Sequence, residues 1–399
     1  MKEIYMDNNA TSRVADEVVE AMLPFFGEKY GNASSMHEFG GQVQRHINKA
    51  RESVAQLLGA ADPGEIIFTS CGTESDNTAL FSALRSYPER RHIVTTRVEH
   101  PAVLNTTRYL QSQGYQATYL AVDGEGMIDL EELRSAVTEN TAVVSIMHAN
   151  NETGVIFPVE KAAEIAAARG AVFHTDAVQS AGKLPLDLKR SNIDMLSLSG
   201  HKLHAPKGIG ALYVRKGTRF VPFMMGGHQE HGRRAGTENA PYIVGLGKAC
   251  ELARKNVETE NTAVKALRDR LEKELLSRIS NAKVNGGKSP RLPNTANISF
   301  EFVEGEAILL MLSDLGIAAS SGSACTSGSL EPSHVLRAMG VPFTFAHGSI
   351  RFSLSVYNTA AEADFVLGKI PAIIERLRRI SPFGKNGKRP QEAGVCREN

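Results

Sequence analysis

The sequence has few of the features that mark secreted, membrane-bound or zinc-stabilised proteins. Its 399 residues include only 4 cysteines, which are too few and too scattered for a disulfide framework. No CxxC spacing occurs, so a structural zinc site is not expected. The N-terminus MKEIYMDNNATSR has no apolar signal core, and no run approaches the roughly 18 apolar residues that span a bilayer. We therefore expect a cytoplasmic protein that does not enter membranes.

An excess of charge of either sign is also absent. Lys plus Arg number 45 against 44 Asp plus Glu, a formal net charge of +1. Proteins that bind nucleic acid usually carry a clear cationic excess, so nucleic acid is not an expected partner. Apolar residues make up 42% and charged residues 22%, which is ordinary for a globular protein of two or three units.

Seven apolar, β-rich segments alternate with helical patterns between about residues 64 and 215. Segments that are apolar on both faces and joined by helices indicate a mainly parallel sheet covered on both sides. The expected strands are EIIFTS, HIVTTRV, YQATYLAV, TAVVSIMH, AVFHTD, DMLSLS and GIGALYVR. Ligands of such sheets bind beyond the carboxyl ends of the strands, so polar residues at these ends are the first site candidates.

The fold class is predicted as α/β, with a large seven-stranded domain and a smaller α+β domain. We place the large domain at residues 16–258, where two long helices are expected to break near Glu258–Asn261. Short strands (NISFEF, GIAASS, IRFSL) mixed with helices indicate the small domain, which we place at residues 1–15 and 259–378. Residues 379–399 are polar and aperiodic, which predicts a loose tail.

The segment IIFTSCGTESDNTALF offers a site for an anion. Its strand ends at Ser70, and Gly72 and Thr73 open a helix with Glu74 in the first turn. Free backbone N–H groups at such a helix start can bind a phosphate. A well-capped helix with no ligand is the alternative.

Three further polar residues belong to apolar strands. Asp176 ends AVFHTD, where a carboxylate could hold the protonated pyridine nitrogen of pyridoxal phosphate (PLP), with Gln179 near the ring hydroxyl. His100 ends a strand and could stack on a flat cofactor and move a proton. Arg351, in IRFSL, could bind an amino-acid carboxylate. The alternatives are capping roles for Asp176 and His100 and a buried ion pair for Arg351.

Lys202 follows the strand DMLSLS and precedes a Gly-rich stretch. A partly desolvated lysine has a lowered pKa and can form a Schiff base, and Ser199 and His201 could bind phosphate beside it. A solvated lysine is the alternative, but Lys202 shares its predicted sheet edge with the anion site and the carboxylate. His201 and His204 are spaced like helical metal ligands, but the sequence offers no third ligand, and no metal is predicted.

Cys325 stands in GIAASSGSACTSGSLEPSHVLRAMG, with no large apolar neighbour from Ser320 to Ser329. Core cysteines have apolar neighbours, so this segment suggests an exposed nucleophile in a mobile loop, with an inert thiol as the alternative. Cys71 and Cys250 are expected to be structural and core residues, respectively.

Together these segments resemble the cysteine desulfurases, a class-V aminotransferase-like branch of the fold-type I PLP-dependent transferases. The likeness covers nearly the whole chain, and its motifs are GNASSMHEFG, FTSCGTESDN, VEHPAVL, ANNETG, HTDAVQSAGK, SGHKLHAPKG, GGHQEHGRRAGTEN and the Cys325 segment. The sequences of these motifs, especially SGHKLHAPKG and the Cys325 segment, are most similar to the NifS type, which supplies sulfur for nitrogenase metalloclusters. The resemblance implies conversion of L-cysteine to L-alanine, with sulfur held on Cys325 as a persulfide and passed to an iron–sulfur scaffold or another acceptor protein.

The resemblance also implies a role for each matching residue. It makes Lys202 the Schiff-base lysine, Cys325 the persulfide nucleophile and His100 the residue stacked on the cofactor. Cys325 is expected in a loop of about residues 320–333 in the small domain. Asn151 and Arg351 are expected to orient the substrate. The resemblance implies that the cofactor is bound by Gly72, Thr73, His100, Asn151, Asp176, Gln179, Ser199, His201, Lys202 and Thr237. Of these, Thr237 would come from the second subunit of a homodimer.

Two departures from the family pattern are minor. Ala33 replaces a common proline, and His148 stands where an aromatic is common in the NifS type; neither removes a functional group. The rival hypotheses are an aminotransferase, a selenocysteine lyase and a cofactor-binding scaffold without chemistry of its own.

Overall fold

A computed structural model describes residues 3–321 and 332–381. Cys325 and Cys396 lie outside these residues, as does most of the predicted tail. Residues 379 and 380, which we predicted as tail, belong to the last helix, α13 (Ala360–Ile380).

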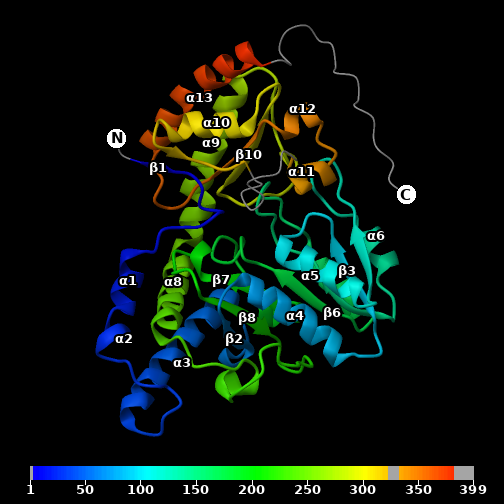
Figure 1. Cartoon of the computed structure of the whole chain (residues 1–399), viewed down its shortest axis with the longest axis vertical. Helices are drawn as coiled ribbons and strands as arrows, with labels where there is room; N and C mark the ends of the chain where they lie inside the picture. Colours follow the sequence, from blue (N-terminus) through cyan, green and yellow to red (C-terminus); the bar gives the residue numbers. More distant parts are fainter. Residues whose placement is uncertain (1–2, 322–331, 382–399) are drawn as a thin grey trace.

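A mixed sheet of seven strands forms the centre of the larger region, in the order β2-β8-β7-β6-β5-β3-β4 (Figure 1). Only β8 runs antiparallel to its neighbours, β2 and β7, and the other four pairings are parallel. The prediction of a mainly parallel, seven-stranded sheet is therefore confirmed. The strands are β2 (Ile66–Thr69), β3 (His92–Thr96), β4 (Gln116–Leu120), β5 (Thr141–Ser145), β6 (Val172–Asp176), β7 (Met195–Ser199) and β8 (Gly210–Val214).

Both faces of this sheet are buried by helices. Because side chains alternate along a strand, Val172 of β6 packs with α4 (Gly72–Ser86) and α5 (Pro101–Ser112), whereas Phe173 packs into the core of the opposite face. That opposite core is completed by helices on the other side, namely α1 (Asp16–Met22), α2 (Pro24–Gly27), α3 (Glu38–Leu58), α6 (Leu130–Ala136), α7 (Val159–Ala167) and α8 (Ala240–Thr259).

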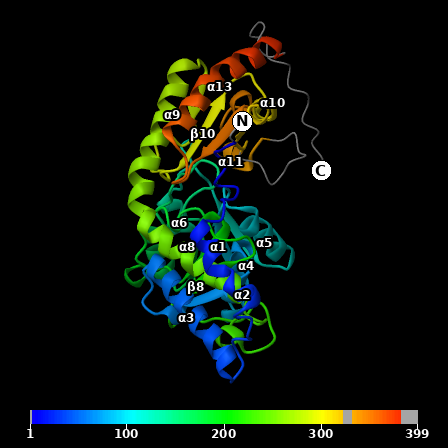
Figure 2. The same cartoon turned by 90° about the vertical axis from the view of Figure 1, so that its left-hand side faces the viewer.

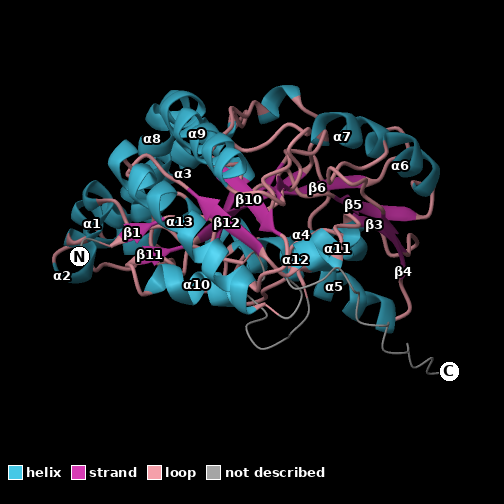
Figure 3. Ribbon diagram, turned by 90° about the horizontal axis from the view of Figure 1, so that it is seen from above, coloured by secondary structure: helices cyan, strands magenta, loops and turns pink. Residues whose placement is uncertain are grey.

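A smaller α+β region lies above the large sheet in Figure 1 and has its own core. The antiparallel sheet β12-β10-β9 and the parallel pair β1-β11 face three long helices, as the view from above shows (Figure 3). The N-terminal strand thus joins elements from the last third of the chain. The elements are β1 (Ile4–Tyr5), α9 (Lys265–Arg278), β9 (Ala282–Val284), β10 (Thr295–Phe300), α10 (Gly305–Ser313), β11 (Ile317–Ala318), α11 (His334–Ala338), α12 (Phe343–Ala346), β12 (Ser349–Ser353) and α13.

The helix break expected near Glu258–Asn261 takes the form of a π-helical turn and not of a loop. Helix α8 passes through a π-helical turn, Glu260–Val264, directly into α9, so the two helices follow one another along the long axis (Figure 2). Asn261 makes the wide turn possible because its Nδ2 donates to the carbonyls of Val257 (2.8 Å) and Lys183 (2.7 Å). Among the described residues, no helix is long and apolar enough to cross a lipid bilayer.

Candidate active site

The side of the sheet that faces α4 changes from apolar to polar along the strands. Val143, Val172 and Met195 begin this side and pack in the α4/α5 core. Two residues further along β5, β6 and β7 come Ser145, His174 and Ser197, and parallel register sets Ser145 beside His174 and Asp176 beside Ser197. The carboxyl end of the sheet therefore offers a polar floor under α4, as expected for a ligand site.

A cavity of about 400 Å³, here called the site cavity, opens at this polar edge. Ten of the twelve predicted site residues line it: Gly72, Thr73, His100, Asn151, Asp176, Gln179, Ser199, His201, Lys202 and Arg351. Lys202 and Asp176 thus face the same space, which the hypothesis of a single cofactor required. The lining also includes residues that the sequence analysis did not single out, among them Asn9, Ala10 and Asp76.

Lys202 is held in place by the N-terminal segment. It ends a 3₁₀ turn, Gly200–Lys202, directly after β7, and its Nζ donates to the carbonyl oxygens of Asn9 and of Ala10, the latter at 2.7 Å. Asn9 is fixed in turn because its Nδ2 donates to Thr295 Oγ1 (2.9 Å). The motif YMDNNAT therefore positions Lys202. The sequence did not reveal this contact because the two segments are far apart along the chain.

Asp176 and His100 serve both as caps and as lining residues. Asp176 Oδ1 accepts from the backbone N–H of Val178 (2.9 Å), and His100 Nδ1 accepts from that of Ala102 (3.2 Å). Burial raises the pKa of Asp176, while His100 and Lys202 act against this rise. Burial lowers the pKa of His100, so its imidazole is neutral near pH 7. The capping alternatives are thus correct but do not exclude a role in the site.

The start of α4 is suited to an anion. Within the described part of the chain, the N-cap residue Cys71 makes no side-chain capping bond, so the alternative of a well-capped helix is wrong. A Cβ atom at Gly72 would lie 2.9 Å from Val178 Cγ2, so only glycine fits there. Glu74 pairs with Arg234 (2.9 Å) and accepts the backbone N–H of Ser70 (2.7 Å). Its charge is therefore engaged by groups other than the N–H groups of Gly72 and Thr73. The free N–H groups of this turn are available to a phosphate.

Arg351 is 2% exposed and makes the buried ion pair that we considered as its alternative role. Its Nη2 lies 2.8 Å from Asp7 Oδ1, and its Nη1 donates to the carbonyl of Asn151 (3.0 Å). Its Nε, however, is buried and has no hydrogen-bond partner among the described residues. Arg351 is therefore oriented by Asp7 and keeps one donor for a ligand.

The residues of the site cavity fit PLP. Besides Arg351 Nε, the buried Oε1 of Gln179 has no hydrogen-bond partner within residues 3–321 and 332–381. Its Nε2 donates to the carbonyl of Asn9 (3.0 Å), which fixes the side chain. A buried carboxylate, an uncapped helix start and a lysine amine suit a ring nitrogen, a phosphate and an aldehyde, respectively.

Other predicted residues lie elsewhere. Thr237 is exposed and does not line the site cavity of its own chain, and Cys325 lies outside the described residues. His148 is buried with Nδ1 2.9 Å from Ser180 Oγ, beneath the cavity, and burial lowers its pKa to about 4. The described residues contain no cluster of three possible metal ligands.

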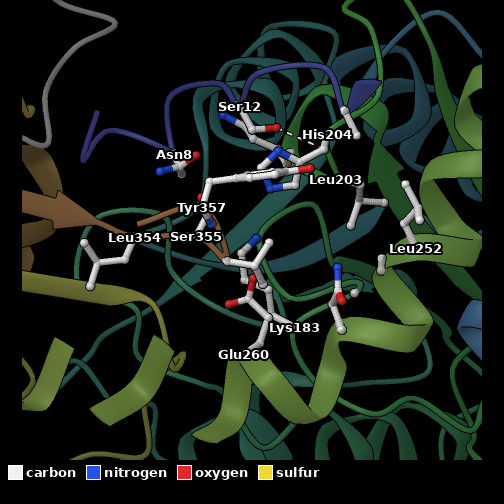
Figure 4. Close-up of a pocket in the computed structure, with 16 residues that line it drawn as sticks. Asn8, Ser12, Lys183, Leu203, His204, Leu252, Glu260, Leu354, Ser355 and Tyr357 are labelled. Carbon is white, nitrogen blue, oxygen red and sulfur yellow. Dashed lines mark hydrogen bonds between the residues drawn. The ribbon is translucent and has the colours of Figure 1, made fainter. Parts of the chain in front are cut away.

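His204 faces a second cavity of about 40 Å³, which lies on the other side of the Lys202 turn. Because His201 lines the site cavity, the two histidines point into different spaces and do not form a metal pair. Figure 4 shows Lys183 and Glu260 together on one side of this second cavity, with Ser12, His204 and Tyr357 across it. It is too small for a cofactor but large enough for a few waters.

This fold and site define a PLP-type transferase, and comparison with known proteins agrees. The class-V aminotransferase family matches residues 4–366, so the chain belongs to that family. It is 60% identical to cysteine desulfurase NifS of Azotobacter vinelandii, over 96% of this chain and 95% of that protein. Identity to a cysteine desulfurase of Trichormus azollae is 61% over 96% of both chains. A solved structure described as a NifS-like protein superposes with a TM-score of 0.87 at 42% identity, covering 94% of this chain and 100% of that one. Within the family, the chain therefore belongs to the cysteine desulfurases.

Proposed function

We propose that this chain converts L-cysteine to L-alanine with PLP and takes up the sulfur on Cys325 as a persulfide. The observation that carries the proposal is the convergence of Lys202, Asp176 and the uncapped start of α4 on one cavity of about 400 Å³. When bound, PLP supplies an electron sink that stabilises negative charge at the α-carbon of an amino acid.

Different lining residues would bind different parts of the cofactor. Lys202 would hold it covalently through Nζ, Asp176 would face its ring nitrogen, Gln179 its hydroxyl, and His100 one ring face. Its phosphate would take the start of α4 together with nearby side chains, namely Gly72, Thr73, Ser199, His201 and Thr237 of the partner subunit.

Substrate binding falls to Arg351 and Asn151. Arg351 lines the site cavity, and a substrate carboxylate there would give its buried, unpaired Nε an acceptor. Asn151 is held close to Arg351 because its carbonyl accepts from Nη1 (3.0 Å). The pair would therefore fix the substrate carboxylate and, through it, the direction of the α-carbon and thiol.

Two residues then move protons. Lys202 Nζ removes the proton from the α-carbon of bound cysteine. His100, neutral because burial lowers its pKa, accepts the proton of the substrate thiol.

Sulfur transfer balances with Cys325 as a thiolate. Its Sγ attacks the sulfur of bound cysteine, a sulfur–sulfur bond forms, and the carbon–sulfur bond breaks. The electron pair of the broken bond stays with the carbon skeleton, which is protonated and leaves as alanine. Because the thiolate is required, the rate should fall as the pH drops below the pKa of Cys325.

The test is to supply the purified protein with L-cysteine and a thiol reductant. Equimolar alanine and sulfide are expected, and Cys325→Ser should abolish both while leaving the visible absorption of the bound cofactor intact. Full turnover by Cys325→Ser would overturn the nucleophile assignment, and transamination without sulfide would favour an aminotransferase instead.

The same proposal includes a cytoplasmic homodimer. Large apolar side chains are exposed on the N-terminal helices and their connections, including Leu23, Phe26, Tyr30, Met36 and Phe39, and such patches favour an interface. Mixing inactive Lys202→Ala with Thr237→Ala subunits should restore activity, because one mixed site would then be complete. If mixing never restores activity although mixed dimers form, Thr237 does not act across the interface.

We further propose that the persulfide sulfur supplies iron–sulfur cluster assembly, and nitrogenase clusters in particular. The 60% identity to NifS of Azotobacter vinelandii supports this acceptor class. Deleting the gene should lower nitrogenase activity more than that of other iron–sulfur enzymes. Equal losses would indicate general cluster assembly.

A further inference from the structure

Asp76 is a buried acid at the site cavity that the proposed mechanism does not use. It lies one turn into α4, is 1% exposed and lines the site cavity together with Asp176. Its Oδ1 has no hydrogen-bond partner in the described part of the chain. The nearest charged candidate is His174, whose Nε2 lies 3.6 Å from Oδ1.

His174 does not supply the positive charge that an ionised Asp76 would need. Both of its ring nitrogens are engaged by hydroxyl groups, Nδ1 with Ser145 Oγ and Nε2 with Ser197 Oγ, each at 2.9 Å. The ring is fully buried, and burial lowers its pKa to about 3, so His174 is neutral. Asp76 therefore faces a chain of neutral hydrogen-bonding groups.

The groups around Asp76 that can carry charge are negative or neutral. Asp176 lies on the same face of β6 as His174, under α4, and Glu99 and Cys71 lie nearby. Burial raises the pKa of Asp76 well above its usual range, and Asp176 raises it further. Burial likewise raises the pKa of Glu99 to about 8, so Glu99 is mostly neutral at pH 7.

Asp176 is in a different position, although it is buried as well. His100 and Lys202 both oppose the rise in its pKa, and a protonated ring nitrogen would add a third positive group. Two close carboxyl groups in a dry site do not both ionise readily, so one proton remains with the pair. These surroundings place the proton on Asp76 and the negative charge on Asp176.

We propose that Asp76 is a positioning residue that holds a proton beside Asp176 and so reserves the negative charge of the pair for the cofactor nitrogen. The inference rests on the proposed function, because it assigns Asp176 to that nitrogen. As a neutral acid, Asp76 donates a hydrogen bond to the buried polar row without adding charge. An ionised Asp76 would instead repel Asp176 and weaken its hold on the ring.

Infrared spectroscopy of the wild-type holoenzyme tests the protonation directly. With only aspartate carboxyl groups labelled with ¹³C, the label-shifted band of a protonated acid is expected at pH 8, and Asp76→Asn should remove it. Labelling aspartate alone excludes Glu99 from the signal. If the wild type shows no protonated aspartate at pH 8, the proposal is overturned, even if the variant does not fold.

The pH dependence of the cofactor absorption gives a second readout. If Asp76 is neutral, Asp76→Asn should move the midpoint of the absorption change by less than about 0.3 pH unit, because the charge near the ring is unchanged. A shift of about one unit or more would show that Asp76 is ionised and would overturn the proposal. Asp364→Asn, an exposed site in the small region, is the matched control for an Asp-to-Asn change.

These outcomes are independent of sulfur transfer. A protein that releases alanine and sulfide but lacks a protonated aspartate retains the proposed function and loses this inference. A protein that shows the infrared band but binds no PLP retains a neutral Asp76, and the proposed function then fails.

Discussion

Two cavities border the Lys202 turn, and each is lined by a lysine and a buried carboxylate. The site cavity has Lys202 and Asp176 and measures about 400 Å³. The second cavity has Lys183 and Glu260 and measures about 40 Å³. Buried charge alone therefore does not identify a catalytic site.

The main difference between the two cavities is how much space their polar groups surround. In the second cavity Lys183 Nζ donates to the carbonyl of Gln179 (3.0 Å) and Asn261 binds the Lys183 carbonyl, so the lysine braces the chain. Around the site cavity, Gln179 Oε1 and Arg351 Nε are without partners among the described residues, in a space of ligand size. Glu260 Oε2 in the second cavity also lacks a hydrogen-bond partner among the described residues, so unsatisfied polar atoms mark a binding site only where the space around them can hold a ligand.

The largest expected effect separates the two lysines. Lys202→Ala should lower the rate of alanine formation by at least about 10³-fold and remove the absorbance near roughly 390–420 nm, because it deletes the covalent attachment and the proton acceptor. Lys183→Met should keep the absorbance and most of the rate but lower the free energy of unfolding by about 1–3 kcal/mol. The comparison fails if Lys183→Met is colourless while folded.

Asp176→Ala should have the next largest effect. Without a carboxylate at the ring nitrogen, kcat should fall roughly 10²–10³-fold while the cofactor remains attached through Lys202. Steady-state kinetics and the visible spectrum together measure both. A normal kcat in a fully loaded Asp176→Ala enzyme would remove Asp176 from the chemistry.

Arg351→Lys should act mainly on substrate binding. Loss of Nε and of the planar fork should raise KM for cysteine about 10–100-fold with a smaller change in kcat. Asp7→Asn is the matched control because it breaks the same ion pair from the side of Asp7 and leaves the guanidinium in place. If both variants raise KM equally, the ion pair is structural and Arg351 does not bind the substrate.

Strand periodicity predicted the large sheet and pointed to eight of the ten lining residues, whereas Asn151 came from the family resemblance and Arg351 lies within β12 of the small sheet. The seven strands carried apolar side chains, and the eight residues lie at or shortly after strand ends, which the common direction of those strands brings to one edge. Asp7 and Asn9 could not be placed in this way, because they reach the site through the pairing of β1 with β11 and through contacts with Ser353 of β12, far along the chain. That pairing depends on tertiary packing rather than local pattern.

Asp76 did leave a signal in the sequence. It shares a helical face with Ala79, Leu80 and Ala83, at spacings of three, four and seven, and all four are buried. An acid on the apolar face of a helix indicates a buried function. The π-helical turn left no such signal in the sequence. The bond from Asn261 to the Lys183 carbonyl holds the turn, and the sequence does not show that this carbonyl lies nearby.

The smallest expected effect concerns Glu260 and is confined to stability. Burial raises the pKa of Glu260 from its usual 4.5 to about 7, and Lys183 acts against this rise. The folded state therefore binds the proton more tightly than the unfolded state. As the pH rises from about 4.5 to about 7, the folded protein loses this advantage, and the free energy of unfolding falls.

Glu260→Gln removes this titration. The difference in unfolding free energy, Glu260→Gln minus wild type, should be larger (more stable variant) at pH 8 than at pH 5 by about 1–3 kcal/mol. Urea titrations of the holoenzyme at both pH values measure the difference, and the exposed neighbour Glu258→Gln should show none. Parallel pH profiles for Glu260→Gln and the wild type would mean that Glu260 is ionised throughout, paired with Lys183 through water. The second cavity would then contain a charged pair, like the site cavity, and size would be the remaining difference between the two.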